Sequence, residues 1–277
     1  MKGLTMRFIG RSWTRIVLSL FLGVLTQAVA LAAPVAIFGD SQHDPAAQRK
    51  VVAAVAAAKP AAVFRVGDLV DNGLDPELWK DFNAINAPLL SSTEYYPALG
   101  NHERSSHLYF KNFPVVKGRH WYSVNREGIH FIVLDSNVAL KPGSLQYRWL
   151  EDDLKEARRQ GLFPVAIFHH PLFDVGRHQA DEKGQRPYLL PLFNKFGLKL
   201  AFSGHDHSYQ RFASGGFTQI VTGGGGSHLD HQYREDPALV KFKRAFHFCL
   251  LSMEKNACRV RVYDIDGDLI DEFFIST

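Results

Sequence analysis

The sequence predicts an α/β fold in which one domain is built on packed sheets. Three observations support this prediction. Short apolar runs alternate with helical stretches, antiparallel strand patterns follow the glycine run at 223–226, and polar residues come directly after the apolar runs. The chain has 277 residues, of which 46% are hydrophobic and 22% are charged, which is enough for one large core. This composition excludes a disordered protein.

Six short apolar runs predict buried strands, at 35–38, 62–66, 95–99, 129–134, 164–168 and 198–202. Helices are expected between them. One spans about 46–59 and stops at Pro60, and another opens at Asp75 and Pro76, an N-cap followed by proline at the first helical position. A third follows Ser144 and runs to Gln160, before Gly161. After the glycine run, strands are expected at 246–253, 259–263 and 269–275.

Residues 1–32 are expected to be a secretory signal peptide. Four basic residues (Lys2, Arg7, Arg11 and Arg15) precede an apolar run at 16–31, and Ala30 and Ala32 form a small-residue cleavage site. The alternative is a membrane anchor, but the run is shorter than the ~20 apolar residues of a spanning helix and contains Thr26 and Gln27. We therefore expect an exported, periplasmic or secreted protein whose mature domain is 33–277, with no stable membrane anchor after cleavage.

The charge balance of the mature chain gives no indication of a nucleic-acid partner. The full chain has 32 Lys+Arg against 28 Asp+Glu, and removal of the four basic residues of the signal leaves 28 of each. A nucleic-acid-binding protein would need a basic patch on the mature domain. The two cysteines, Cys249 and Cys258, lie in an expected C-terminal hairpin, but its register is not readable, so a disulfide between them stays open. The sequence does not indicate an oligomeric state.

Polar side chains follow five of the expected strands at the point where each strand ends. These residues are Asp40, Asp68, Asn101, His169 and His205, most of them directly after a glycine. In open α/β sheets the carboxyl ends of the strands form the ligand-binding edge. Turn chemistry alone would account for a single Asp or Asn at such a place, but five coincidences in one chain predict a site.

The ligand types in these segments predict a metal centre. The segments contain carboxylate, carboxamide and imidazole groups but no thiolate, a set that suits manganese, iron, zinc or cobalt. Two such ions about 4 Å apart hold a bridging hydroxide and clamp a phosphate for in-line attack. We therefore expect two divalent or trivalent transition metals.

The order of the motifs carries a family resemblance. Asp40, Gly67-Asp68-x-x-Asp71, Gly100-Asn101-His102-Glu103, His169 and Gly204-His205-x-His207 together resemble the calcineurin-like metallophosphoesterase superfamily. The segment 204–211 is especially similar to the purple acid phosphatase branch. The resemblance covers nearly the whole mature chain and implies a four-layer αββα sandwich with the metals at the strand ends, acting on a small phosphorylated substrate.

The resemblance also implies a role for each matching residue. Asp68 would bridge the metals, Asp40 and His207 would bind the first, and Asn101, His169 and His205 would bind the second. His102 would protonate the leaving group or steady the transition state, while Asp71 and Glu103 would orient the residues that bind the metals. His170 lies beside the ligand position, and His169 is preferred because the family's ligand stands two residues before proline, here Pro171.

The chain departs from the family pattern at two positions. The first motif of the family is usually Asp-x-His, whereas here Gln42 occupies the histidine position and His43 follows it. Either residue, or water, would complete the first metal's ligands, and that metal would then bind more weakly. Asp71 stands where purple enzymes carry a tyrosine, so no iron–tyrosinate colour is expected.

The substrate side of the site is less defined by sequence. Arg177 and His228 are candidates for the substrate pocket because they follow the His169-His170 motif and the glycine run, respectively. Phosphomonoester hydrolysis by a metal-bridging hydroxide is the leading prediction. The alternatives are a phosphodiesterase, for example on cyclic nucleotides, and a non-catalytic module that binds metal or phosphate. A serine hydrolase is disfavoured because the chain lacks Gly-x-Ser-x-Gly.

Overall fold

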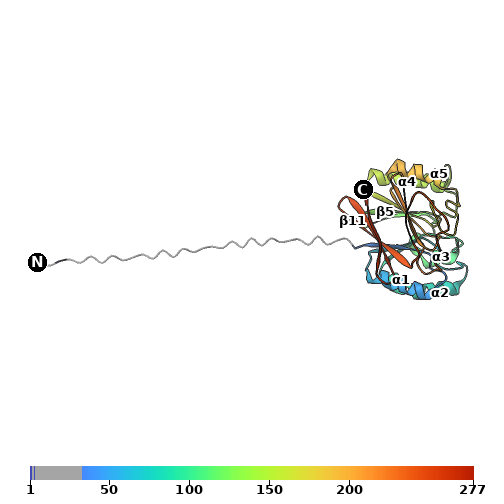
Figure 1. Ribbon diagram of the computed structural model, residues 1–277, viewed down its shortest axis with the longest axis horizontal. Helices are drawn as coiled ribbons and strands as arrows, with labels where there is room; N and C mark the ends of the chain where they lie inside the picture. The colour runs from blue at the N-terminus through green and yellow to red at the C-terminus, as the bar shows by residue number, and fades with distance from the viewer. Residues whose placement is uncertain (2, 4–32) are drawn as a thin grey trace. The chain divides into compact units, whose positions relative to one another are not determined.

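Two mixed β-sheets pack face to face, and helices cover the outer face of each (Figure 1). The computed structural model describes residues 1, 3 and 33–277, so the expected signal peptide lies almost entirely outside the described residues. The described residues from 33 onward form one compact unit. This arrangement confirms the predicted four-layer αββα sandwich.

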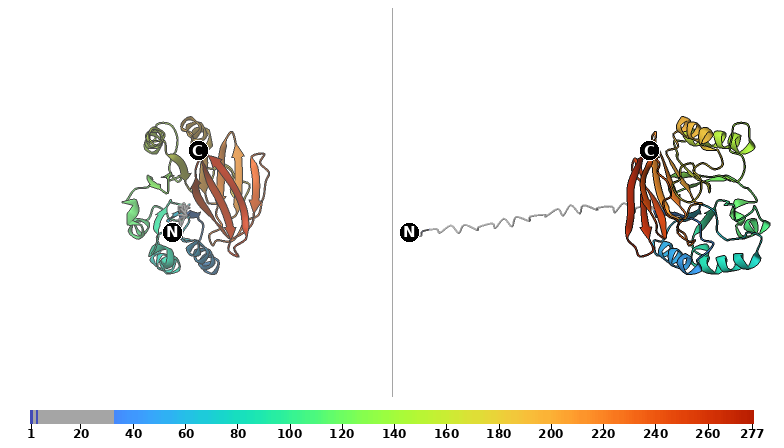
Figure 2. Two further views of the ribbon diagram at one scale, coloured as in Figure 1. Left: turned by 90° about the vertical axis from the view of Figure 1, so that its left-hand side faces the viewer. Right: turned by 45° about the vertical axis from the view of Figure 1, so that its right-hand side comes forward.

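The first sheet has the strand order β13-β12-β11-β1-β2-β3. Its parallel half comprises β1 (Val35–Phe38), β2 (Ala62–Arg65) and β3 (Glu94–Pro97). Val35 on β1 lies opposite Ala62 on β2, and Ala62 lies opposite Glu94 on β3. The antiparallel half is the C-terminal meander β11 (His247–Glu254), β12 (Ala257–Asp264) and β13 (Leu269–Ser276), whose three strands lie side by side in Figure 2. The helices α1 (Pro45–Ala57) and α2 (Pro76–Leu90) pack beside each other against this sheet.

The second sheet has the strand order β10-β8-β9-β7-β6-β5-β4. The strands β5 (Ile129–Val133), β6 (Phe163–Ile167), β7 (Leu200–Ser203) and β9 (Phe217–Thr222) are parallel, and β4 (Tyr122–Arg126), β8 (Tyr209–Ser214) and β10 (Leu239–Lys243) pair antiparallel. The helices α4 (Leu145–Arg159) and α5 (Arg186–Phe196) cover its outer face. A short helix α3 (His107–Asn112) and a 3₁₀ turn η1 (Pro114–Val116) follow β3.

The two sheets meet through interdigitated apolar side chains. The rings of Phe64 on β2 and Phe131 on β5 stack with centroids 4.0 Å apart, and both are fully buried. Buried side chains of this size supply most of the free energy that holds the sheets together. Among the described helices, none combines the length and apolarity needed to cross a bilayer.

The expected helix starts and strand runs form as predicted. The structure also shows that Cys249 and Cys258 do not form a disulfide. Asp75 and Ser144 cap α2 and α4 by accepting backbone N–H groups. In the C-terminal hairpin Cys249 pairs with Val262 and Cys258 pairs with Met253, so the two thiols stand at different positions along it. Both cysteines are free and buried. The elements α3, α5, β4, β8, β9 and β10 were not predicted.

Candidate metal centre

The parallel registers bring the strand ends of both sheets to one edge. Asp40, Asp68 and Asn101 follow β1, β2 and β3 of the first sheet. His169 follows β6, and His205 and His207 follow β7 of the second sheet. The structure therefore collects all six side chains that were expected to bind metal, three from each sheet, around one pocket.

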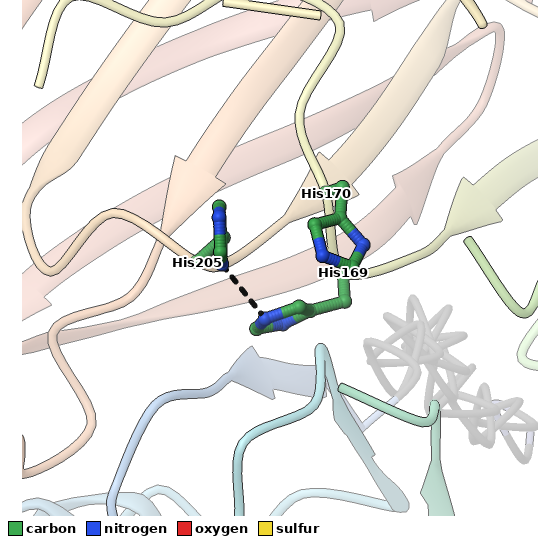
Figure 3. Close-up of side chains that lie close together, drawn as sticks. All are labelled: His169, His170 and His205. Atoms are coloured by element: carbon green, nitrogen blue, oxygen red, sulfur yellow. Dashed lines mark hydrogen bonds between the residues drawn. The ribbon is translucent and has the colours of Figure 1, made fainter. Parts of the chain in front are cut away.

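Three potential ligand atoms surround the Nε2 atom of His169, which is itself a fourth. The Nδ1 atom of this fully buried ring lies 2.9 Å from the carbonyl oxygen of Val66 and donates to it, so Nε2 faces the site. Nε2 lies 3.0 Å from Asn101 Oδ1 and 3.2 Å from Asp68 Oδ2. It also lies 3.2 Å from His205 Nδ1, the contact drawn in Figure 3. Separations of this size between electron-pair donors, three of them on buried residues, fit ligands that share one cation.

The electrostatics of His169 agree with this interpretation. Burial lowers the pKa of His169, but the carboxylates of Asp68 and Asp40 together with the hydrogen bond to Val66 outweigh burial and raise the pKa to about 9. Burial alone would raise the pKa of Asp68, yet His169 and His102 hold it well below its usual range. In the metal-free protein a proton on His169 therefore supplies positive charge at the place where the ligands need a cation.

Asp40, His207 and Gln42 surround a second position beside the first. Asp40 Oδ1 accepts the backbone N–H of His205 at 2.8 Å and lies 3.8 Å from His207 Nε2, while Asp40 Oδ2 is buried and has no hydrogen-bond partner in the part of the chain that the structure describes. His207 donates from Nδ1 to the carbonyl oxygen of His228 at 2.9 Å, which leaves Nε2 toward Asp40. An unpaired buried carboxylate oxygen is costly unless a cation completes it.

Gln42 and His43 occupy different environments. The side-chain nitrogen of Gln42 lies 3.4 Å from His207 Nε2, and its Oε1 atom is buried without a partner. Both ring nitrogens of His43 are already paired, Nδ1 with Ser227 Oγ at 2.5 Å and Nε2 with Asp71 Oδ1 at 3.1 Å. The geometry therefore favours Gln42 over His43 as the residue beside the first metal position.

The ligand loops have an unusual backbone. Asp40, Asp68 and His205 adopt φ values of 56°, 50° and 74°, a left-handed conformation that non-glycine residues rarely take and that costs about 1–3 kcal/mol each. The preceding glycines allow close approach between loops, because a Cβ on Gly100 would collide with Asp68 Oδ1 and one on Gly204 with Asp40 Oδ2. The surrounding packing holds this strained backbone, as is common at functional sites.

Glu103 is hydrogen-bonded to the loops that follow β2 and β3. Its two carboxylate oxygens accept the backbone N–H groups of Asp68 (2.9 Å), Leu69 (2.7 Å) and Gly100 (2.7 Å). Burial, followed by the nearby charge of Asp68, raises the pKa of Glu103 to about 7. Glu103 thus ties the β2 and β3 loops together through their backbone, while the ring of His102 contacts Asp71 instead.

His170 is buried behind the site. Its ring lies beside that of His169 (Figure 3), with centroids 4.9 Å apart. Its Nδ1 atom lies 2.9 Å from Ser136 Oγ. Burial, followed by the charge of His169, lowers the pKa of His170 well below its usual value, so the ring is neutral.

A pocket of about 220 Å³ opens above these ligands. Arg177 and His228, which were expected from sequence to line it, lie on its wall with Arg177 Nη1 3.4 Å from His228 Nε2. The pocket is lined by Gln42, His43, Asp68, Asn101, His102, Arg177, His178, His205, His207 and His228. The pocket wall therefore presents cationic and N–H-bearing side chains, and the carboxylate of Asp68 lies among the residues that line it.

Sequence reasoning missed three residues that support the pocket. Asp206, between the two ligands of its motif, accepts the backbone N–H groups of Arg177 (2.6 Å) and His178 (3.2 Å). Asp230 accepts the backbone N–H of His207 at 3.1 Å. Glu182 lies 3.4 Å from His205 Nε2. Asp206 could have been found from its place inside the Gly-His-x-His motif, whereas the other two lie in segments without a recognisable pattern.

Taken together, these residues fit a pair of cations. Asp68 groups with both Asp40 and His169, the donor atoms are oxygen and imidazole nitrogen, and Asp40 Oδ2 has no hydrogen-bond partner among the described residues. Such a set suits divalent or trivalent transition metals.

Comparison with known proteins agrees with the geometry. Probable purple acid phosphatase 20 of Arabidopsis thaliana is 30% identical over 166 residues, which cover 53% of this chain and 39% of that protein. Purple acid phosphatase 7 of Arabidopsis thaliana is 24% identical over 248 residues, with 77% of this chain and 75% of that protein covered. The chain spans about two fifths of the length of the first curated relatives it matches.

Solved structures share the fold at low sequence identity. Purple acid phosphatase PPD1 from yellow lupin (Lupinus luteus) seeds superposes with a TM-score of 0.77 at 20% identity, covering 88% of this chain and 54% of that chain. GAP50, described as the anchor in the inner membrane complex of Plasmodium, superposes with a TM-score of 0.76 at 16% identity, covering 89% of both chains. A family model described as calcineurin-like phosphoesterase matches residues 33–209, a segment that contains every predicted metal ligand. The chain belongs to the calcineurin-like phosphoesterase family.

Proposed function

We propose that this chain is an exported phosphoesterase that holds two transition-metal ions and hydrolyses phosphomonoesters. The convergence of Asp68, Asn101 and His205 on Nε2 of His169 is the observation that carries the proposal. Family membership supports a metal-dependent phosphoric ester hydrolase in general. Export, the choice of monoester and the identity of the metals (manganese, iron, zinc or cobalt) are parts of the proposal.

Asp40, Asp68 and His207, with Gln42 beside them, would hold the first ion, and Asp68, Asn101, His169 and His205 would hold the second. When bound, the two ions would supply Lewis-acid stabilisation of phosphate oxygens and a water of lowered pKa. The chain's own residues perform the remaining tasks. Glu103 fixes the backbone of the ligand loops, and His102 presents Nε2 to the pocket, where a leaving oxygen would receive its proton.

The pocket wall supports a monoester as substrate. Arg177 carries a permanent positive charge, and His178 and His228 add imidazole groups around a cavity of about 220 Å³. A phosphomonoester is a dianion near neutral pH and gains more from such a wall than a singly charged diester does. The small volume also favours a substrate with one substituent on phosphorus.

Export is supported by the N-terminal sequence. The basic start, apolar run and small-residue site of residues 1–32 have the order of a secretory signal. This part of the proposal stands independently of the catalytic part.

A substrate panel tests the proposal. Metal-stripped protein would be reconstituted with each of the four metals and assayed on an aryl phosphomonoester, an alkyl phosphomonoester, an aryl phosphodiester and a cyclic nucleotide. We expect metal-dependent turnover with the monoesters preferred. A preference for the diesters would mean that the substrate class is phosphodiesters and not phosphomonoesters. Two of the similar Arabidopsis thaliana proteins are described as probable inactive purple acid phosphatases, so metal binding without turnover of any ester would make this chain a non-catalytic binding module.

A further inference from the structure

Two buried imidazole nitrogens point at one carboxylate beside the site. His170 and His205 are 2% and 6% exposed, and the Nε2 atom of each lacks a hydrogen-bond partner within the described part of the chain. His205 Nε2 lies 3.4 Å from Glu182 Oε2, and His170 Nε2 lies 3.6 Å from Glu182 Oε1. Glu182 belongs to the segment 176–185, which runs from the pocket wall to α5. One carboxylate therefore faces both rings, one oxygen to each.

The hydrogen bonds of Ser136 determine which nitrogen of His170 carries the proton. Ser136 Oγ accepts the backbone N–H groups of His170 (2.9 Å) and His169 (3.3 Å), which occupies both of its lone pairs. Its own hydrogen is then free for His170 Nδ1, which lies 2.9 Å away. Because Nδ1 accepts this bond, the proton of the neutral ring sits on Nε2 and faces Glu182.

The position of His205 indicates that its proton also sits on Nε2. Its Nδ1 atom lies 3.2 Å from His169 Nε2, on the side where the second metal ion would be held. With Nδ1 committed to a metal, the single remaining proton of the ring sits on Nε2, which faces Glu182. Metal-binding histidines commonly donate their other ring N–H to a carboxylate, which fixes the ring and makes it a stronger ligand.

A third metal ion at this place is less consistent with the contacts. His178, Glu182 and His205 bring three potential ligand atoms together. However, the rings of His178 and His205 are in face contact, tilted by 35° with centroids only 3.8 Å apart, an arrangement that does not bring them to a common ion from separate directions. Lys183 Nζ also lies 3.2 Å from Glu182 Oε1 and already supplies a positive charge.

We propose that Glu182 is a positioning residue for the second metal, accepting the Nε2–H groups of His205 and His170 on its two oxygens. The inference rests on the proposed dinuclear site and deepens it. Since the segment 176–185 also carries Arg177 and His178, occupancy of the second metal position and placement of this pocket wall become coupled. Loss of the Glu182 carboxylate lowers the affinity of the second metal position and, as a consequence, disturbs the placement of the pocket wall.

Calorimetric titration of metal-free protein with zinc tests this proposal on the wild type and three variants. Wild type binds two equivalents. Glu182→Gln, which places an amide N–H against one of the two rings, lowers the affinity of the second equivalent by about 10–100-fold, the usual effect of losing such a support, and leaves the first unchanged. Glu182→Asp keeps a carboxylate and recovers part of the loss. Lys183→Met removes the neighbouring charge but no histidine contact, and it matches wild type.

A spectroscopic measurement separates positioning from a general structural effect. In long-range ¹H–¹⁵N spectra of the zinc-loaded wild type, His170 and His205 appear as Nε2–H tautomers with slowly exchanging protons. In Glu182→Gln these protons exchange faster, while the thermal midpoint of the metal-free variant stays at the wild-type value. Should Glu182→Gln fail to fold, the intermediate affinity of Glu182→Asp provides the same comparison.

Three results would overturn the proposal, and they are distinguishable. Equal zinc affinities of wild type and Glu182→Gln, with two equivalents each, remove the role of Glu182 and leave the dinuclear site intact. A third equivalent in wild type that disappears in Glu182→Gln makes Glu182 a metal ligand instead. A wild type that binds no zinc, manganese, iron or cobalt defeats the proposed function itself, and the Glu182 inference with it.

Discussion

The Nδ1 atom of His102 lies 2.6 Å from the backbone carbonyl oxygen of Asp71. This contact places the Nδ1 proton on the Asp71 side and leaves Nε2 toward the pocket, 3.9 Å from Asp68 Oδ2. The Asp71 carboxylate lies 3.3 Å from the same Nδ1 atom. Asp71 thus holds a place beside the proposed acid, at the position where purple enzymes carry a tyrosine.

Replacement of His102 by Gln or Ala should slow alkyl phosphates much more than nitrophenyl phosphates. A poor leaving group needs a proton in the transition state, and general acid catalysis contributes about 10²–10⁴-fold. Steady-state rates on both ester types, with metal content measured beside them, check this expectation. His107→Gln, an exposed histidine on α3, is the matched control and should behave as wild type. Equal losses on the two ester types would mean that His102 acts by position or charge.

Asp68→Asn should remove or disorder both metals, because one carboxylate faces both metal positions. Asp68 Oδ2 lies 3.2 Å from His169 Nε2, and the residue groups with Asp40 as well. Elemental analysis after dialysis should give well under two metals per chain, whereas Asp81→Asn on the exposed face of α2 should keep both. Two tightly held metals in Asp68→Asn would contradict the bridging role.

Gln42→His should tighten the first metal, by about 10–100-fold if the imidazole reaches the position that the Gln42 side chain occupies beside His207. The first step of a metal titration measures this affinity. His43→Ala is the variant to compare with it, because both ring nitrogens of His43 already pair with Ser227 and Asp71. That variant should retain both metals, and loss of the first metal from it would transfer the ligand role from Gln42 to His43.

The metal-free protein should lose stability as the pH rises from 6.5 to 9. The pKa of His169 is raised from its ordinary 6.5 to about 9 in the folded protein, because Asp68, Asp40 and the hydrogen bond to Val66 together outweigh the effect of burial. The folded state therefore binds more protons than the unfolded state in this window, so the stabilisation is complete below pH 6.5 and is lost as the pH passes through 9. Urea denaturation of metal-stripped protein at several pH values measures this slope. His169→Gln should flatten it, and an equally steep slope in that variant would assign the effect to another group.

The exported protein should begin at Ala33 or within a few residues of it, because β1 starts at Val35. Intact-mass measurement of the protein recovered from the cell exterior or periplasm checks this. A full-length chain found in the membrane fraction would mean that residues 1–32 serve as an anchor.

The sequence could predict that the six residues expected to bind metal lie together, because each one stands in the loop that follows the end of a short apolar strand. The fold fixes where those ends meet, so a local pattern was enough to predict a shared site. The strand runs themselves were also readable, although Arg65 shows the limit of an apolar pattern. Its guanidinium is fully buried in β2, stacks 4.1 Å above the ring of Phe38 and donates to Ser41 and Tyr95.

The supporting residues could not be predicted because their contacts span long stretches of chain. His43 and Ser227 are 184 residues apart in the sequence, and their pairing decides that His43 turns away from the first metal position. Glu182 lies in a segment with no helical or strand period. The helix α5 was missed because Pro191 interrupts its pattern, yet Pro187 near its start and Gly197 at its end are ordinary boundary signals.

The equal division of the ligands between the two sheets has a consequence for how variants should be interpreted. In the proposed centre each metal position takes side chains from both sheets, so bound ions would cross-link two layers that are otherwise held by apolar contacts such as Phe64 with Phe131 and by a few loop hydrogen bonds. Metal content then reports on the alignment of the layers as well as on the ligands. A substitution deep in the core, far from any ligand, would be detected first as a chain that has released its metal.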